Sequence, residues 1–401
     1  MPKPHDFLET SAELDELCRA LRQAEILAFD TEFISENRYR PELCLIQVCY
    51  DGHLALVDAL AIGSTQSFWE VVVDGPAIPV THAGRAELLF CHEATGRMPS
   101  RLFDVQVAAG LAGYEYPASY ANLVGRLTRD ELRKSETRSD WRKRPLTPEQ
   151  LQYALQDVQY LPDMYRRLER ELQTLQRLDA LREEMDETQR QLLIQEVEQP
   201  WFRLASSQGL RPRGQAILVE LWKWRDRKAA RKNLPPRRVL RDDLLMELAR
   251  REASQPQGIL ALRGMNRSDL DVQEIAAAIQ RGLAAPTLPG SGSANSRSPD
   301  EHGLLGQHLY TAFGLVCREH RVAPALAGSV QDVRKLAAWY LGEQRPEDPL
   351  PKLLTGWRRQ VVGEFIEEVM DGRWAISVDR ANLELPLKLH RISAGNACEG
   401  A

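Results

Sequence analysis

Three apolar, strand-forming runs follow one another near the start of the chain. They are AEILAFDTEF, LCLIQVCY and HLALVD, all within residues 24–58. Runs of this length that are rich in β-branched and aromatic residues are typical of buried strands. The dipeptide Asp51-Gly52 lies just before the third run and favours a hairpin turn. The sequence therefore predicts a sheet that begins with antiparallel pairing.

The remaining pattern divides the chain into regions of different kind. A short strand is expected over 77–82, and a helix after Gly84 opens a helical pattern that continues to about residue 175. This predicts an α/β domain with a mixed sheet flanked by helices. Amphipathic helices follow, interrupted by a stretch dense in Pro, Gly and Ser that is typical of a linker. The expected boundaries are 1–180, 181–204 (a helical connection), 205–284, 285–302 (the linker), 303–386 and 387–401 (a tail).

Composition narrows the class of protein. A chain of 401 residues is too long for one core, and its 43% hydrophobic and 27% charged residues are ordinary for a globular protein. It contains no run of about 18 apolar residues, and its polar start does not resemble a signal peptide. None of the six cysteines forms a CxxC pair. Reduced thiols, no membrane association and a cytoplasmic location are therefore expected.

Charge is unevenly distributed. The net charge of −5 does not indicate a nucleic-acid-binding protein, but residues 126–144 hold eight Lys or Arg against four Asp or Glu. Residues 223–241 hold nine Lys or Arg against one acid, Asp226. Each segment is either a solvated helix face or a surface that contacts phosphates.

Carboxylates occur in pairs that suit a metal ion. Asp30 and Glu32 in FDTEF project to the same side of a strand, where burial is costly unless a cation compensates. Mg²⁺ and Mn²⁺ prefer such oxygen ligands, although two acids solvated at a strand end are the simpler alternative. Tyr153 and Asp157 share one helix face at i and i+4, as in many ordinary amphipathic helices. Glu87 lies one turn into the helix after Gly84.

Taken together, these motifs resemble the DEDDy 3′→5′ exonuclease superfamily, and most closely ribonuclease D. FDTEF resembles the first family motif, THAGRAELLF the second, and KSETRSDWRKRPLTPEQLQYALQDVQYLP the third with the stretch before it. The resemblance covers about residues 20–175 and implies a ribonuclease H-like sheet domain. It departs from the family at Glu87, where an Asp is usual. Asp104 is the nearest alternative acid, and its simplest role is to cap a helix.

The resemblance implies two-metal phosphodiester hydrolysis. Asp30, Glu32, Glu87 and Asp157 would hold two divalent ions, Mg²⁺ or Mn²⁺, and Tyr153 would orient the attacking water. The residues expected to bind RNA are Phe33, Lys134, Arg138, Trp141, Arg142, Lys143 and Arg144. For Phe33 the alternative is core filling, and for Trp141 it is packing of the loop onto the domain.

The second half resembles the helicase-and-RNase-D C-terminal (HRDC) domain. Residues 212–249 carry its W-x-W-R-x-x-x-A run and NLPP turn, and 303–386 look like a more divergent second copy through LLTGWRRQVVGE. This implies two all-α bundles that hold nucleic acid. In the first copy Arg225, Lys228, Arg231 and Arg237 are expected to face phosphates. The linker predicts that residues 286–401 form a separable unit.

The expected function is that of a 3′→5′ exoribonuclease that releases 5′-mononucleotides. Structured RNA is the expected partner, with tRNA precursors the leading candidate, and no obligate protein partner is evident. Two alternatives stay open: a DNA-directed exonuclease of the same superfamily, and a nucleic-acid-binding protein with a decayed site, for which Glu87 would be the first symptom. The chain has no GxxxxGK[ST] phosphate loop, which argues against an attached helicase.

Overall fold

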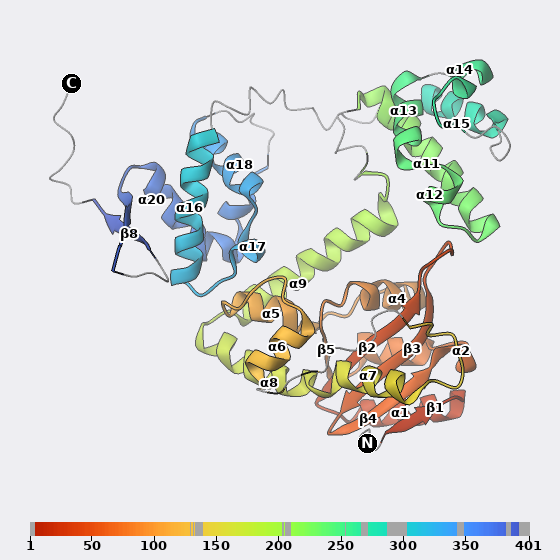
Figure 1. Cartoon of the computed structure of the whole chain (residues 1–401), viewed down its shortest axis with the longest axis horizontal. Helices are drawn as coiled ribbons and strands as arrows, with labels where there is room; N and C mark the ends of the chain where they lie inside the picture. The colour runs from red at the N-terminus through yellow and green to blue at the C-terminus, as the bar shows by residue number, and fades with distance from the viewer. Residues whose placement is uncertain are drawn as a thin grey trace.

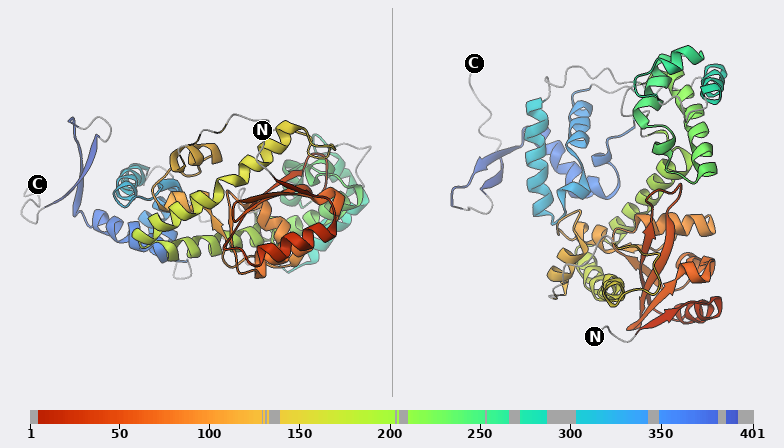
Figure 2. Two further views of the ribbon diagram at one scale, coloured as in Figure 1. Left: turned by 90° about the horizontal axis from the view of Figure 1, so that it is seen from below. Right: turned by 45° about the vertical axis from the view of Figure 1, so that its right-hand side comes forward.

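The computed structural model describes residues 5–128, 130, 132, 139–202, 204, 210–252, 254–265, 272–286, 303–342, 349–381 and 386–392. Every helix within these ranges is too short or too polar to cross a membrane. A mixed sheet with its helices forms one end of the molecule, and two helical bundles lie on the same side of it (Figures 1 and 2).

The sheet has six strands in the order β1-β4-β3-β2-β5-β6. Their bounds are β1 Asp6–Leu8, β2 Ile26–Ile34, β3 Glu42–Tyr50, β4 His53–Asp58, β5 Ile78–Thr81 and β6 Phe103–Asp104. β2, β3 and β4 pair antiparallel, whereas β5 pairs parallel with β2. The expected strands, the hairpin and the mixed sheet are confirmed. β1 and β6 were not predicted, because segments of two or three residues leave no periodic pattern.

Helices cover both faces of this sheet. Their bounds are α1 Ser11–Leu21, α2 Ala59–Ile62, α3 Gln66–Asp74, α4 Arg85–Thr95, α5 Val105–Leu111, α6 Tyr120–Leu127, α7 Pro148–Gln159 and α8 Leu161–Thr174. On one face Phe29 of β2 packs edge-on against Phe68 and Trp69 of α3. α7 packs against β2, β3 and β4. Its start is fixed by a capping box in which Thr147 and Gln150 satisfy each other's backbone N–H groups.

The first helical bundle has a core of its own. After α9 (Leu178–Leu193) and a π-helical turn (Ile194–Glu198), it comprises α11 Pro212–Lys232, α12 Pro236–Val239, α13 Asp242–Arg251, α14 Pro256–Leu260 and α15 Val272–Ala284. α11 and α15 approach so closely that a Cβ at Gly282 would lie 2.4 Å from the Cα of Ile217. The bundle touches the sheet domain where the Tyr39 hydroxyl donates to Asp226, at 2.8 Å.

The second bundle shares a continuous buried core with the sheet domain. It comprises α16 Gly303–Glu319, α17 Pro324–Ala327, α18 Val330–Tyr340, a 3₁₀ turn Lys352–Leu354, α19 Gly356–Arg358, a π-helical turn Arg359–Gly363 and α20 Glu364–Met370. A hairpin of β7 (Trp374–Val378) and β8 (Leu387–Arg391) follows. The expectation of an all-α unit ending at residue 386 is therefore wrong at that boundary, since β8 lies in the expected tail.

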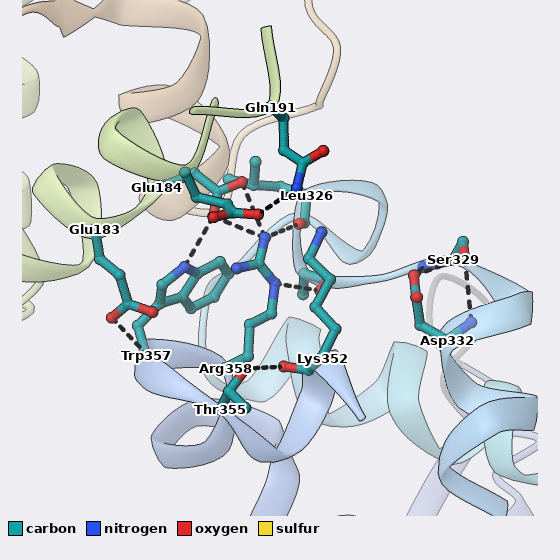
Figure 3. Close-up of polar contacts among 12 residues, drawn as sticks. Glu183, Glu184, Gln191, Leu326, Ser329, Asp332, Lys352, Thr355, Trp357 and Arg358 are labelled. Carbon is teal, nitrogen blue, oxygen red and sulfur yellow. Dashed lines mark hydrogen bonds and ion pairs between the residues drawn. The ribbon is translucent and has the colours of Figure 1, made fainter. Parts of the chain in front are cut away.

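A buried ion pair fastens this bundle to α9 (Figure 3). The Arg358 guanidinium lies 2.7 Å from the Glu184 carboxylate, and the same carboxylate accepts a 3.0 Å hydrogen bond from the indole of Trp357. Gly356 packs so tightly on Glu183 that a Cβ there would lie 1.6 Å from its carboxylate oxygen. The expectation that residues 286–401 are separable is therefore wrong, because removing them would uncover a buried face of the sheet domain.

Candidate active site

The first two candidate acids lie on β2, on the face opposite to Phe29. Since strand side chains alternate, Asp30 and Glu32 share the face that α7 covers. The register between β2 and β3 shifts directly after Glu32: Glu32 is opposite Leu45, whereas Phe33 is opposite Leu43. Such a bulge bends a strand and re-aims its side chains. Beyond it, Phe33 packs edge-on against Phe90 of α4, with 5.5 Å between ring centres.

The third acid, Glu87, comes from α4. β2 pairs with β5 only through Ile26–Ala28, so the start of α4 can lie against the β2 edge beyond that point. The Glu87 side chain is buried there and accepts a hydrogen bond from the hydroxyl of Thr31. Its carboxyl group also contacts Asp30.

Asp104 has a different role. Its carboxylate accepts backbone hydrogen bonds from Ala83 at 3.1 Å, Gly84 at 3.0 Å and Gln106 at 2.8 Å. It thus caps α5, as expected, and also fixes the turn from which α4 begins. That turn is tight, because a Cβ at Gly84 would lie 2.3 Å from the side chain of Thr81. With three backbone hydrogen bonds to its carboxylate, Asp104 fixes the start of α4, the helix that carries Glu87.

The remaining candidates come from α7. Tyr153 and Asp157 share one face of the helix, as expected, and are hydrogen-bonded to each other. Trp141 is buried and packs 6.0 Å from the Tyr153 ring. It therefore holds the preceding loop against α7, in agreement with the alternative weighed for it, and is not exposed to stack on a base. The four acids and Tyr153 thus come together from β2, α4 and α7.

Burial of like charges dominates the electrostatics of this cluster. Burial, together with the charges of Asp157 and Glu87, raises the pKa of Glu32 to about 8. Burial also raises the pKa of Asp157 to about 7, against the lowering effect of the Tyr153 hydrogen bond. The pKa of Asp30 is raised well above its ordinary value, first by burial and then by Glu87 and Asp157. A bound cation would favour the charged form of these carboxyl groups and lower their pKa values again.

The donor set fits a hard divalent cation. All four groups are carboxyls, the ligand type that Mg²⁺ and Mn²⁺ prefer. In the described part of the chain, however, no three His, Cys, Asp or Glu side chains are already arranged to hold a metal ion. Glu87 is turned toward Thr31, so metal binding requires side chains of the cluster to reorient.

Comparison with known proteins identifies the family. Residues 6–173 match the 3′-5′ exonuclease family model and residues 214–276 the HRDC domain model. Ribonuclease D of Gluconacetobacter diazotrophicus is 32% identical over 93% of this chain and 94% of its own length. Ribonuclease D of Zymomonas mobilis is 31% identical over 96% of this chain and 98% of its own length. The chain belongs to the ribonuclease D family.

The fold of the whole chain agrees with this family. Escherichia coli RNase D, described as an exoribonuclease involved in structured RNA processing, superposes with a TM-score of 0.77 at 28% identity. The match covers 92% of this chain and 99% of that one. This chain is therefore an enzyme of the ribonuclease D type, and the family and fold imply the use of divalent metal ions. The HRDC match covers the first bundle, whereas the second bundle as a divergent copy remains a prediction.

Among the loop residues expected to bind RNA, Arg144 has a structural role instead. Its guanidinium forms an ion pair with Asp58, which is 2% exposed, and donates to the carbonyl of Cys44 at 3.1 Å. Cys44 is the extra residue at the β3 bulge, so Arg144 ties the loop before α7 to the sheet. Arg142 and Lys143 are exposed and stay in the proposed RNA-binding set. Lys134 and Arg138 lie outside the described residues.

Two of the four first-bundle cations that were expected to face phosphates are instead buried. Arg225 is buried, pairs with Asp242 at 2.6 Å and donates to the carbonyl of Leu240. Lys228 is buried against Trp224 and pairs with Glu274 at 3.2 Å. Both stabilise the bundle and do not face solvent. The side chains of Arg231 and Arg237 are 67% and 80% exposed, so they can meet phosphates despite their acidic partners.

Sequence patterns did not reveal the residues that support the cluster. Thr31 lies between two predicted ligands but on the other face of β2, and an isolated Thr gives no signal. Tyr120 is half-buried near Asp157 and Asp30, and its hydroxyl donates to the carbonyl of Gln156 at 3.0 Å. Its partner is a backbone atom 36 residues away, which no local pattern can indicate.

The buried acids predict a pH-dependent stability in metal-free protein. A carboxyl whose pKa is raised in the folded state contributes stability that is fully present below its unfolded pKa and is lost as pH rises through the folded value. With the pKa raised from 4.5 to about 8 for Glu32 and from 3.8 to about 7 for Asp157, the Tm in EDTA should fall between about pH 4 and pH 8. Mg²⁺ should reduce this fall, and so should Glu32→Gln. Identical pH profiles for the wild type and Glu32→Gln would contradict the assignment.

Substitutions of Arg144 and Arg142, two residues apart in the loop before α7, should have opposite effects. Arg144→Ala leaves the buried Asp58 carboxylate without its cation and should destabilise the protein by about 1–3 kcal/mol in urea denaturation. Arg142→Ala removes an exposed cation and should leave stability within about 0.5 kcal/mol. It should nevertheless weaken RNA binding and reduce its dependence on salt. An Arg142→Ala protein that binds RNA like the wild type at low salt would remove this residue from the RNA surface.

Proposed function

We propose that this chain is a 3′→5′ exoribonuclease that uses two divalent cations, Mg²⁺ or Mn²⁺, to shorten structured RNA one nucleotide at a time. The observation that carries the proposal is the convergence of Asp30, Glu32, Glu87 and Asp157 from three elements into one buried cluster. Membership of the ribonuclease D family supports the same activity. The 3′ trailers of tRNA precursors are the substrates we favour.

The four carboxylates would hold the ions, and Tyr153 would complete the site. Bound divalent ions supply an activated water and neutralise the charge of the scissile phosphate. Burial and the neighbouring carboxylates raise the pKa of Tyr153, so its phenol keeps its proton at neutral pH. The phenol can therefore orient the attacking water by hydrogen bonding but does not serve as its base. Water would attack the phosphorus of the last phosphodiester and the bond from that phosphorus to the 3′ oxygen would break. The 3′ oxygen would leave as the hydroxyl of the shortened chain, and the released nucleotide would carry a 5′ phosphate.

Two groups of cations would guide the substrate. Arg142 and Lys143 lie in the loop that leads into α7, close in sequence to Tyr153. Arg231 and Arg237 lie on the first bundle, which touches the sheet domain through Tyr39. Contacts to phosphates from both places would hold RNA by charge without reading its sequence.

A trimming assay tests the activity and its rivals. A 5′-labelled RNA with a single-stranded 3′ extension should be shortened stepwise with Mg²⁺ or Mn²⁺ and not with EDTA, and matched DNA should be degraded more slowly. Asp30→Asn should reduce turnover roughly 1,000-fold, because a metal ligand contributes several kcal/mol to transition-state stabilisation. Its metal-free Tm should not fall. Faster degradation of DNA would favour the DNA exonuclease, and no metal-dependent degradation of either would favour a decayed site.

Glu87 and Asp104 can be separated by their phenotypes. Glu87→Gln should lower turnover strongly, because the amide keeps the shape and loses the charge, whereas Glu87→Asp should keep substantial activity. Asp104→Asn should instead lower stability by about 1–3 kcal/mol, since it weakens three backbone hydrogen bonds. Its folded fraction should turn over RNA within a few-fold of the wild type. Full activity of Glu87→Gln in parallel RNA-cleavage and denaturation measurements would exclude Glu87 as a ligand.

A further inference from the structure

Gln47, in the middle of β3, is an amide buried without a partner. Its side chain is completely inaccessible to solvent. Neither its amide oxygen nor its amide nitrogen has a hydrogen-bond partner among the described residues. The other unpartnered buried side-chain atoms in this part of the chain are single atoms, on Glu42 and Thr81. Gln47 differs because its whole polar group is unsatisfied.

The register of the sheet places this amide next to the acid cluster. Gln47 is directly opposite Asp30 in the antiparallel pair of β2 and β3. Residues opposite each other in such a pair point to the same face, with their Cβ atoms about 4.5–5.5 Å apart. Gln47 therefore shares the face of Asp30 and Glu32, over which α7 carries Tyr153 and Asp157.

Its other neighbours along β3 and across to β4 on this face are apolar. Leu45 and Cys49 are its neighbours on the same face of β3, and Leu56 is opposite it on β4. An apolar side chain of similar length would fill this space without burying an unpaired amide, which is unfavourable. Simple core filling thus accounts for the volume of Gln47 but not for its chemistry. Its polar atoms require a partner that the cluster gains in another state.

Binding of a cation by Asp30 provides such a state. In the structure Asp30 accepts one hydrogen bond from a main-chain N–H, that of Thr31, at 2.9 Å. A carboxylate that becomes charged against a cation accepts stronger, shorter hydrogen bonds than a neutral carboxyl group. Groups that donate to a ligating carboxylate orient it and tune the metal it holds. The amide nitrogen of Gln47 is the donor on the neighbouring strand that can serve Asp30 in this way.

We propose that Gln47 is a positioning residue for Asp30. When a divalent cation is bound, its amide nitrogen donates to the Asp30 carboxylate, directly or through one water, and fixes the direction in which that carboxylate meets the cation. The inference rests on the proposed function, because it takes Asp30 to be a metal ligand. Gln47 itself touches neither metal nor RNA.

Substitutions without an amide test this role. Gln47→Met keeps the length of the side chain and removes both polar atoms, and Gln47→Leu is a second apolar variant should the first fold poorly. The matched control is Leu56→Met, which changes the neighbouring buried residue on the side away from Asp30. For each protein we would measure Mn²⁺ affinity by titration, the metal-free Tm, and kcat and KM on a 3′-extended RNA at saturating Mn²⁺.

Gln47→Met should bind Mn²⁺ roughly 10–100-fold more weakly than the wild type. Its kcat should fall while KM for RNA stays within about twofold, and its metal-free Tm should equal or exceed that of the wild type, since an unpaired amide is gone. Leu56→Met should match the wild type in Mn²⁺ affinity. Wild-type Mn²⁺ affinity in both folded Gln47 variants would overturn the inference, as would an equal loss in Leu56→Met.

Failure of the proposed function gives a different result. If Asp30→Asn binds Mn²⁺ as tightly as the wild type, the acid cluster is not the metal site, and the role of Gln47 falls with it. If Asp30→Asn loses Mn²⁺ binding but the Gln47 variants keep it, the metal site stands and only the role of Gln47 is wrong.

Discussion

Burial of four carboxyl groups beside an interior strand of the sheet is the constraint to which the rest of the sheet domain is adapted. Phe29 packs on α3 and fixes the face to which Asp30 and Glu32 point, so neither acid can turn to solvent without breaking the core. The acids therefore stay buried, and burial raises their pKa values. A site of this kind stores unfavourable free energy in the metal-free protein and releases it when cations bind, which couples metal affinity to folding.

Each element that carries an acid is held by its own local interaction. β2 is held by its antiparallel pairing with β3. The start of α4 is fixed by Asp104, which gathers three backbone N–H groups. α7 is fixed by its capping box and by Arg144, which links the preceding loop to Asp58. These supports lie outside the cluster, and they explain how four buried acids are kept close together in the metal-free protein.

The sequence predicted features that local patterns determine. The strand period predicts β2 to β4 and places Asp30 and Glu32 on one face of β2. The helix period places Tyr153 and Asp157 on one face of α7. Local patterns could not predict which Lys and Arg side chains are buried. Arg225 and Arg231 occur in one basic run, yet one is buried against Asp242 and the other is exposed, because their partners come from other helices. The docking of 303–392 was likewise missed, since a linker shows where a unit begins but not what it packs against.

The two helical bundles consequently relate to the active site in different ways. The second is continuous with the core of the sheet domain and is fastened by the buried pair of Glu184 and Arg358, so it moves only if that core opens. The first has a separate core and meets the sheet domain through Tyr39, in the turn between β2 and β3. A few hydrogen bonds at a half-exposed turn are weak beside a shared core. The first bundle is therefore the less firmly attached of the two, and its contact lies on the turn that follows the strand of Asp30 and Glu32.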